Sequence, residues 1–153
     1  METSMAATGR ARRRYRTIET QPERMVGQRI DVRTFLGRAF DWATRRIVST
    51  WSEASTGARS KEAAGDFLTD GYAEVFSDPP YGIRANLDQV NAWFEAINRE
   101  LLGGLDDDLV IWSWSTDWST WFEDGREWWG AYLWTIEREG LPWITAIGAS
   151  STD

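Results

Sequence analysis

The chain has 153 residues and a net charge of −7, from 17 basic and 24 acidic residues, and its length suits one compact domain. It contains eleven tryptophans but neither histidine nor cysteine. These absences exclude His/Cys metal sites, Ser-His-Asp and Cys-His nucleophiles, and disulfides. The acidic balance disfavours nucleic acid and anionic membrane surfaces as partners.

Residues 1–29 form a polar segment that carries seven arginines and three glutamates. The segment has no sustained apolar period, which predicts a flexible arm; a basic arm for an anionic partner is the alternative. No apolar core follows the arginines, and no apolar stretch of the chain approaches the ~18 residues that span a membrane. We therefore expect a cytoplasmic protein with its folded domain over residues 30–153.

The first predicted element is a long helix over residues 31–54, capped by Asp31. A short helix over residues 60–68 and a strand over residues 72–77 follow, the strand being favoured by its aromatic and β-branched residues. Residues 78–82 contain two prolines and must leave regular structure. The long helix is predicted from one apolar stripe at three- and four-residue steps, which comprises Val32, Phe35, Leu36, Ala39, Phe40, Ala43, Ile47 and Trp51.

A third helix is predicted to begin at Asn86, because Asn86 and Gln89 stand in capping-box positions, and to end at Gly103-Gly104. Beyond residue 109 the apolar period changes to two. This change predicts antiparallel strands over residues 109–118, 127–138 and 141–150, with turns at 123–125 and 139–140. The order of elements predicts an α+β protein with its helices on one face of an antiparallel sheet.

The even-numbered residues of the first two strands are bulky and aromatic, and we assign them to the concave face under the helices. The odd-numbered residues are too apolar for full exposure, which suits a sheet face buried in a homodimer. Several indole N–H groups in one small core are hard to satisfy without water or a ligand. We therefore expect a ligand cavity, with simple core filling as the alternative. The even set comprises Val110, Trp112, Trp114, Thr116, Trp128, Gly130, Tyr132, Trp134 and Ile136.

Two segments, FLTDGYAEVFSDPPYG over residues 67–82 and GLPWITAIGASSTD over residues 140–153, resemble the SnoaL-like branch of the nuclear transport factor two-like superfamily. Relatives in that superfamily include ketosteroid isomerases, polyketide cyclases and limonene epoxide hydrolases. The resemblance covers about residues 31–150. It implies a cone-shaped α+β barrel, in which three helices from the N-terminal half pack on a curved antiparallel sheet around a deep apolar pocket. It also implies a homodimer through the outer sheet face.

The resemblance also implies a catalytic residue. The pair Asp78-Pro79 is similar to the position of the general base in ketosteroid isomerases, and an Asp in an aromatic pocket would have a raised pKa. The alternative is that Asp78 only shapes the turn before Pro79. The oxyanion-hole residues of those isomerases have no counterparts here, because residues 31–54 contain no Tyr and the late strand carries no acid near Leu133.

We therefore predict a small-molecule enzyme that acts on an apolar, flat or polycyclic substrate by isomerisation, cyclisation or hydration. Asp78 is the expected acid or base, and no cofactor or metal is expected. The alternative is a non-catalytic module of the same fold that binds a hydrophobic ligand or dimerises. The expected substrate contacts are Phe76, Tyr81, Trp112, Trp114, Tyr132 and Trp134.

Overall fold

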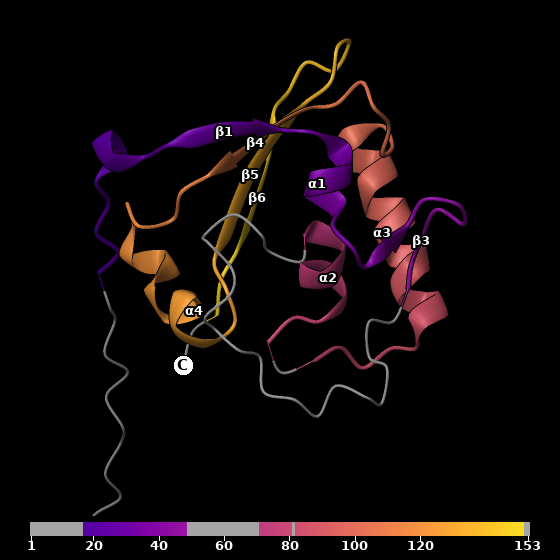
Figure 1. Cartoon of the computed structure of the whole chain (residues 1–153), viewed down its shortest axis with the longest axis horizontal. Helices are drawn as coiled ribbons and strands as arrows, with labels where there is room; N and C mark the ends of the chain where they lie inside the picture. Colours follow the sequence, from indigo (N-terminus) through magenta and orange to yellow (C-terminus); the bar gives the residue numbers. More distant parts are fainter. Residues whose placement is uncertain (1–16, 49–70, 81, 152–153) are drawn as a thin grey trace, which may run out of the picture.

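The computed structural model describes residues 17–48, 71–80 and 82–151. Its main sheet has four antiparallel strands in the order β1-β4-β5-β6, and helices lie on one side of it (Figure 1). The predicted α+β class is thus confirmed. Within the described residues the sheet has two edges, β1 and β6, and does not close into a barrel. The strands are β1 (Gly27–Ile30), β4 (Val110–Trp114), β5 (Tyr132–Glu137) and β6 (Thr145–Ala149).

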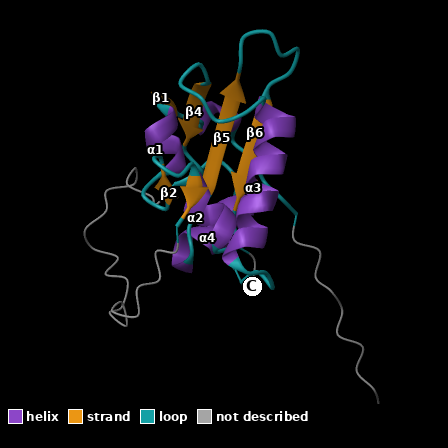
Figure 2. Ribbon diagram, turned by 90° about the vertical axis from the view of Figure 1, so that its right-hand side faces the viewer, coloured by secondary structure: helices purple, strands orange, loops and turns teal. Residues whose placement is uncertain are grey.

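Helices α1, α2 and α3 cover the inner face of this sheet, and α4 lies near one end of it (Figures 1 and 2). A separate two-stranded hairpin of β2 and β3 stands beside α3. Two short 3-10 helices, η1 and η2, precede β1 and α4. The bounds are η1 (Pro22–Arg24), α1 (Val32–Leu36), β2 (Phe40–Asp41), β3 (Arg46–Ile47), α2 (Tyr72–Ser77), α3 (Leu87–Leu102), η2 (Thr120–Phe122) and α4 (Glu123–Trp128).

The three predicted strands correspond to β4, β5 and β6, although each is shorter than predicted. The turn at residues 139–140 is confirmed, whereas the turn predicted at 123–125 is wrong, because these residues begin α4. Gly125 is a glycine for a packing reason. A side-chain carbon there would lie 2.4 Å from the carbonyl oxygen of Gly130.

Strand β1 was not among the predicted elements. Residues 27–30 pair with β4 from Gly27 opposite Trp114 to Ile30 opposite Ile111. The chain before β1 also follows the sheet, since the Gln21 N–H donates to the Trp118 carbonyl over 2.7 Å. The part of the predicted arm that the structure describes therefore lies along the folded domain.

The predicted long helix over residues 31–54 is wrong. Asp31 does cap a helix, accepting a 2.7 Å hydrogen bond from the Thr34 N–H, but α1 ends at Leu36. The chain then turns into the β2–β3 hairpin, whose Phe40 and Ile47 are both buried. The apolar residues that were spaced as in one long helix are thus buried partly in α1 and partly in the hairpin. Residues 49–54 and the helix predicted at 60–68 lie outside the described residues.

The strand predicted over residues 72–77 is also wrong, because these residues form α2. Tyr72 and Phe76 lie one helical turn apart, and their ring centroids are separated by 6.0 Å. The aromatic and β-branched residues that predicted a strand are explained instead by their burial on one side of a helix. The irregular segment after Ser77 and the start of α3 are confirmed: Asn86 and Gln89 form the capping box, and Gly103 ends α3 with a φ of +70°.

The strand register sets which residues share a face. Ile111 lies opposite Ile136 and Trp112 lies opposite Thr135, so paired residues on β4 and β5 have numbers of opposite parity. Trp112 and Trp114 consequently face away from the helices, while Trp134 and Ile136 are buried beneath them. The assignment of all even-numbered residues to one face is therefore wrong for β4, because the intervening η2 and α4 change the parity.

The core between the helices and the sheet is largely aromatic. Phe35 stacks on Tyr72 with ring centroids 4.9 Å apart, and Trp134 packs edge-on against Phe35 at 5.4 Å. Phe94 joins the same cluster from α3 at 5.2 Å from Tyr72. Separately, no helix in the described ranges is long and apolar enough to cross a membrane.

Candidate functional site

A cleft of about 610 Å³ lies between the β2–β3 hairpin and α3. Its volume falls in the range of small-molecule sites. Buried Phe40 and Phe94 and the segment around Leu105 provide its apolar part. Ala92 also lines it, and its polar and charged lining comprises Thr44, Arg45, Arg46, Asp88, Asn91, Glu95, Asn98, Arg99 and Asp106.

The hairpin is shaped by the side chain of Asp41. Its carboxylate accepts a 2.7 Å hydrogen bond from the Thr44 hydroxyl and a 3.0 Å hydrogen bond from the Ala43 N–H. These two bonds, that from Thr44 first, lower the pKa of Asp41 below its usual value. The turn ends at Arg45, whose φ of +57° is unusual for a residue with a side chain. This conformation directs the chain back towards α3.

Asn91 attaches the hairpin to α3. The Ile47 N–H donates to Asn91 Oδ1 over 2.7 Å, and Asn91 Nδ2 donates to the Ile47 carbonyl over 3.0 Å. The amide thus makes the pair of bonds that a third strand would make along β3. Asn91 is buried, so these bonds fix the wall of the cleft at its base.

The tip of the hairpin is held by Arg45. Its Nη2 donates to the Leu105 carbonyl over 2.6 Å, beyond the end of α3. The guanidinium of Arg45 also lies 5.2 Å from the ring centre of Trp42, and that of Arg33 lies 4.6 Å from it. Trp42 is therefore flanked by two cations, an arrangement that favours the strained backbone of Arg45.

Each arginine of the cleft lies beside a carboxylate. Arg46 pairs with Asp88 at 2.5 Å, and Arg45 lies 3.5 Å from Asp106. Arg99 pairs with Glu95 one turn away on α3. All of these side chains are about half exposed or more, and such pairs stabilise the fold by little. An incoming charged group can therefore exchange with either partner at small energetic cost.

Asn98 lines the inner part of the cleft and is 2% exposed. Its Nδ2 donates to the Phe94 carbonyl over 2.7 Å, and its side chain hydrogen-bonds to Tyr72. Burial raises the pKa of Tyr72 to about 12, although the bond to Asn98 opposes the shift. The tyrosine is consequently neutral over the whole physiological range and acts as part of the core.

The predicted tryptophan wall is divided between the two faces of the sheet. Trp112 and Trp114 stack on each other at 5.9 Å on the outer face, where Trp114 Nε1 donates to Thr135 Oγ1 over 2.9 Å. Tyr132 and Trp134 stack at 5.4 Å on the inner face. One ligand inside the domain therefore cannot touch all four rings.

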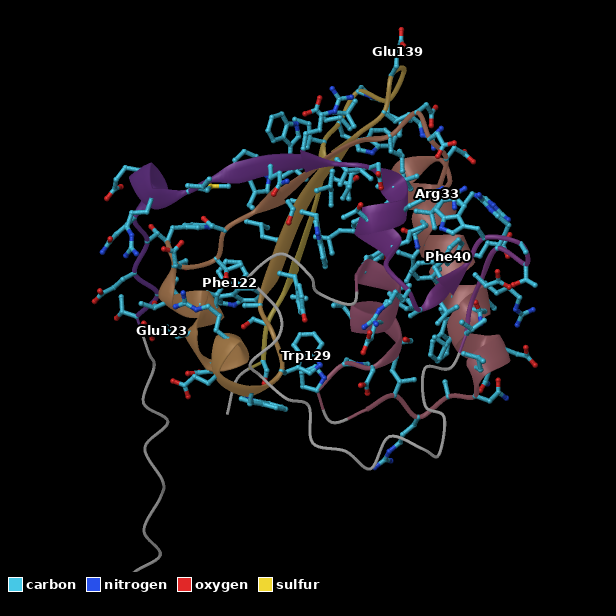
Figure 3. All side chains as sticks on the ribbon, in the orientation of Figure 1. Arg33, Phe40, Phe122, Glu123, Trp129 and Glu139 are labelled. Carbon is cyan, nitrogen blue, oxygen red and sulfur yellow. The ribbon has the colours of Figure 1, made fainter. Side chains whose placement is uncertain are left out.

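Part of the predicted site does lie together. Phe76 contacts the core cluster through Phe94 at 5.0 Å. Asp78 follows α2 directly, is half-buried, and accepts a 3.1 Å hydrogen bond at its carbonyl from Trp129 Nε1. Trp129 in turn packs edge-on against Tyr132 at 5.7 Å. Figure 3 shows Trp129 between α4 and α2, well apart from Arg33 and Phe40 beside the hairpin. Tyr81 lies outside the described residues.

The cleft residues were not found from the sequence. Asn98 follows Val90 and Phe94 at four-residue steps, and a polar residue in such an apolar row is a usable signal for a buried hydrogen bond. Arg45 and Arg46 fall within the helix that the sequence predicted over residues 31–54. Only the hairpin brings them to α3.

Aspartates 106–108 lie in the loop after α3, and two of them pair with Arg138. Its Nη1 lies 2.8 Å from Asp108, and its Nη2 lies 3.4 Å from Asp106. In the described ranges no group of three or more carboxylates is arranged to hold a metal ion. The loop is thus cross-linked to β5 by an arginine.

Fold and site together define an α+β domain with a charged cleft on one side of α3. Comparisons with protein-family models, curated proteins and solved structures find no match for this chain.

Proposed function

We propose that this domain binds a small dipolar molecule in the cleft between the β2–β3 hairpin and α3. A dipolar molecule here carries an ammonium group together with a carboxylate or a phosphate. The observation that carries the proposal is the lining of the 610 Å³ cleft, where guanidinium and carboxylate groups alternate above an apolar base.

The balance of charge in the cleft selects this class of ligand. Among the described residues, three arginines and three carboxylates line it. A purely anionic ligand is repelled by the three carboxylates, and a purely cationic ligand is repelled by the three arginines. A ligand with both charges pairs with a guanidinium and a carboxylate at the same time. Arg99 and Glu95 are the most suitable such pair, because both are largely exposed and lie on a rigid helix.

Thermal unfolding in the presence of each free L-amino acid at 5 mM tests the proposal. At least one amino acid should raise the midpoint by several degrees, since a ligand at about 100 times its Kd adds about 2.7 kcal/mol. Propionate and propylamine, which carry one charge each, should give no comparable shift. Replacing Arg99 by Ala should weaken binding by at least ~10-fold.

The matched control is Arg84→Ala, an exposed arginine outside the cleft lining. This variant should bind as the unchanged protein does. The proposal is wrong if no amino acid shifts the midpoint, or if Arg84→Ala weakens binding as much as Arg99→Ala.

A second function, acid–base catalysis by Asp78 on an apolar substrate, is supported by one observation. Trp129 joins Asp78 to the inner cluster of Tyr132, Trp134 and Phe76, so four of the predicted site residues belong to one neighbourhood. A relationship to the SnoaL-like enzymes is part of this second proposal. The placement of helices on one face of an antiparallel sheet is consistent with that relationship.

This second function predicts catalysed proton exchange. The domain should accelerate deuterium uptake at the α-carbon of 2-tetralone, a flat apolar ketone, in D₂O. Asp78→Asn should lower that rate at least ~100-fold and leave the circular dichroism spectrum unchanged. Asp107→Asn, in the exposed loop after α3, is the control. Equal rates for the unchanged protein and Asp78→Asn exclude Asp78 as the base.

A further inference from the structure

Large apolar side chains are exposed along one flank of α3. Trp93, Ile97 and Leu101 follow each other at four-residue steps and are all exposed, so they form a continuous row of about two turns. Trp143 and Ile144, which precede β6, are exposed as well. We call these five side chains the apolar row. Such a cluster is typical of a surface that another protein covers.

An unprotected sheet edge lies on the same side of the molecule. Among the described residues β6 pairs only with β5, and its residues Thr145–Ala149 contain no charge and no proline. The opposite edge strand, β1, carries exposed Gln28 and Arg29. Charged residues and prolines are the usual means of preventing an edge from pairing. The edge of β6 lacks both, so it is available to another strand.

The fold brings the row and the edge together. One flank of α3 faces the β2–β3 hairpin through Asn91 and Asp88, so the apolar row points to the opposite side. The sheet order places β6 last on that same side, and Figure 2 shows β6 and α3 along one side of the molecule. Trp143 Nε1 and Thr145 Oγ1 both donate to the Leu101 carbonyl over 3.1 Å.

We propose that a second copy of this chain covers this surface. The two β6 strands pair antiparallel across a twofold axis and continue the sheet from one copy to the other, and the two apolar rows pack together beneath them. Antiparallel pairing of a strand with its own copy satisfies twofold symmetry directly. The five side chains of the apolar row and the residues of β6 carry no charge, which favours a second copy over a charged partner.

The size of the surface supports a dimer. Because a large apolar side chain has roughly 200 Å² of surface, the five half-exposed members of the apolar row leave about 500 Å² uncovered. A stable interface buries about 800 Å² on each partner. The apolar row alone thus provides more than half of that area, and the backbone edge of β6 adds to it.

The sequence predicted a homodimer through the outer sheet face. That face is covered by its own side chains to a larger extent than the apolar row and the edge of β6 are. The Trp114 ring lies over Gly27, within 2.6 Å of where a side-chain carbon of that residue would stand, and its N–H is bonded to Thr135. Trp112 stacks beside it and is only partly exposed. The edge of β6 is therefore a more suitable surface for a second copy than the outer face is.

The test is sedimentation velocity at protein concentrations from 1 to 100 µM. The unchanged protein should be a dimer at the upper end, and Ile97→Lys should raise the dimer Kd at least ~100-fold, because it places a charge in the apolar row. Ile97 is 39% exposed, and Val48, which follows β3 on the hairpin side of α3, is 40% exposed. Val48→Lys is therefore a matched control away from β6 and should dimerise normally.

Hydrogen exchange of the backbone amides in residues 145–149 separates strand pairing from other contacts. These amides should be protected at 100 µM, and the protection at the free edge should be lost in Ile97→Lys, whose circular dichroism spectrum stays unchanged. A monomeric unchanged protein at 100 µM overturns the proposal. So does a dimer that Ile97→Lys leaves intact, or one that Val48→Lys dissociates as readily as Ile97→Lys.

Discussion

Gly71→Ala lowers the free energy of unfolding by about 4 kcal/mol, from strained backbone and a steric clash together. Gly71 precedes α2 with a φ of +87°, and a side-chain carbon there would lie 2.5 Å from the backbone of Gly37. The substitution must separate the end of α1 from the start of α2. Urea unfolding of the variant measures the loss, which is a large part of the stability of an ordinary domain.

Gly140→Ala is the matched control for this prediction. Gly140 has a φ of +88°, and no atom lies within 4 Å of the position of its added carbon. It tests the backbone contribution alone, which should cost about 1–2 kcal/mol. If the two variants are equally stable, Gly71 is not required for close contact of α1 and α2.

Asn91→Leu should destabilise the domain by about 3 kcal/mol, because it leaves the buried N–H and carbonyl of Ile47 without partners. Leucine has the same branched arrangement of side-chain heavy atoms as asparagine and leaves no cavity, so the loss reports mainly the hydrogen bonds. The same variant should also lose ligand binding, since the hairpin wall of the cleft is held to α3 by this side chain.

Hydrogen exchange at the Ile47 amide separates this local role from a general loss of stability. The amide should exchange at least ~100-fold faster in Asn91→Leu under conditions where the core amides of β5 are still protected. Asn98→Leu is the comparison, because Asn98 bonds to Phe94 and Tyr72 and not to the hairpin. Equal exchange at Ile47 in both variants contradicts the assigned role of Asn91.

Elements with local signals were predictable from the sequence. The start of α3 follows from the capping box of Asn86 and Gln89, and its end follows from Gly103, because each signal acts within a few residues. Strands β4, β5 and β6 follow from an apolar period of two. The prediction of both helices and antiparallel strands was sufficient to identify the α+β class.

Elements that depend on distant contacts were not predictable. The apolar residues from Val32 to Ile47 fit a helix and equally fit α1 followed by a hairpin, and the second arrangement is stabilised by Asn91 from a helix 44 residues further on. Residues 27–30 become a strand only because β4 offers them an edge.

The candidate site was not predictable for the same reason, because it depends on contacts between distant parts of the chain. A period of two shows which residues of one strand share a face, but it does not relate the faces of two strands. The register of β4 and β5 separates Trp112 from Trp134. The charged cleft depends on a hairpin that the periodicity did not indicate, so its arginines could not be grouped from their positions in the chain.

Nuclear magnetic resonance of the ¹⁵N-labelled protein tests whether the ligand binds in the cleft. The side-chain amide signals of Asn91 and Asn98 report on the cleft, and the indole N–H signals of Trp129 and Trp134 report on the inner aromatic cluster. On titration with the amino acid that stabilises the protein most, we predict that the two amide signals shift and the two indole signals do not. Shifts of the indole signals with unchanged amide signals would mean that the ligand binds in the inner aromatic cluster and not in the cleft.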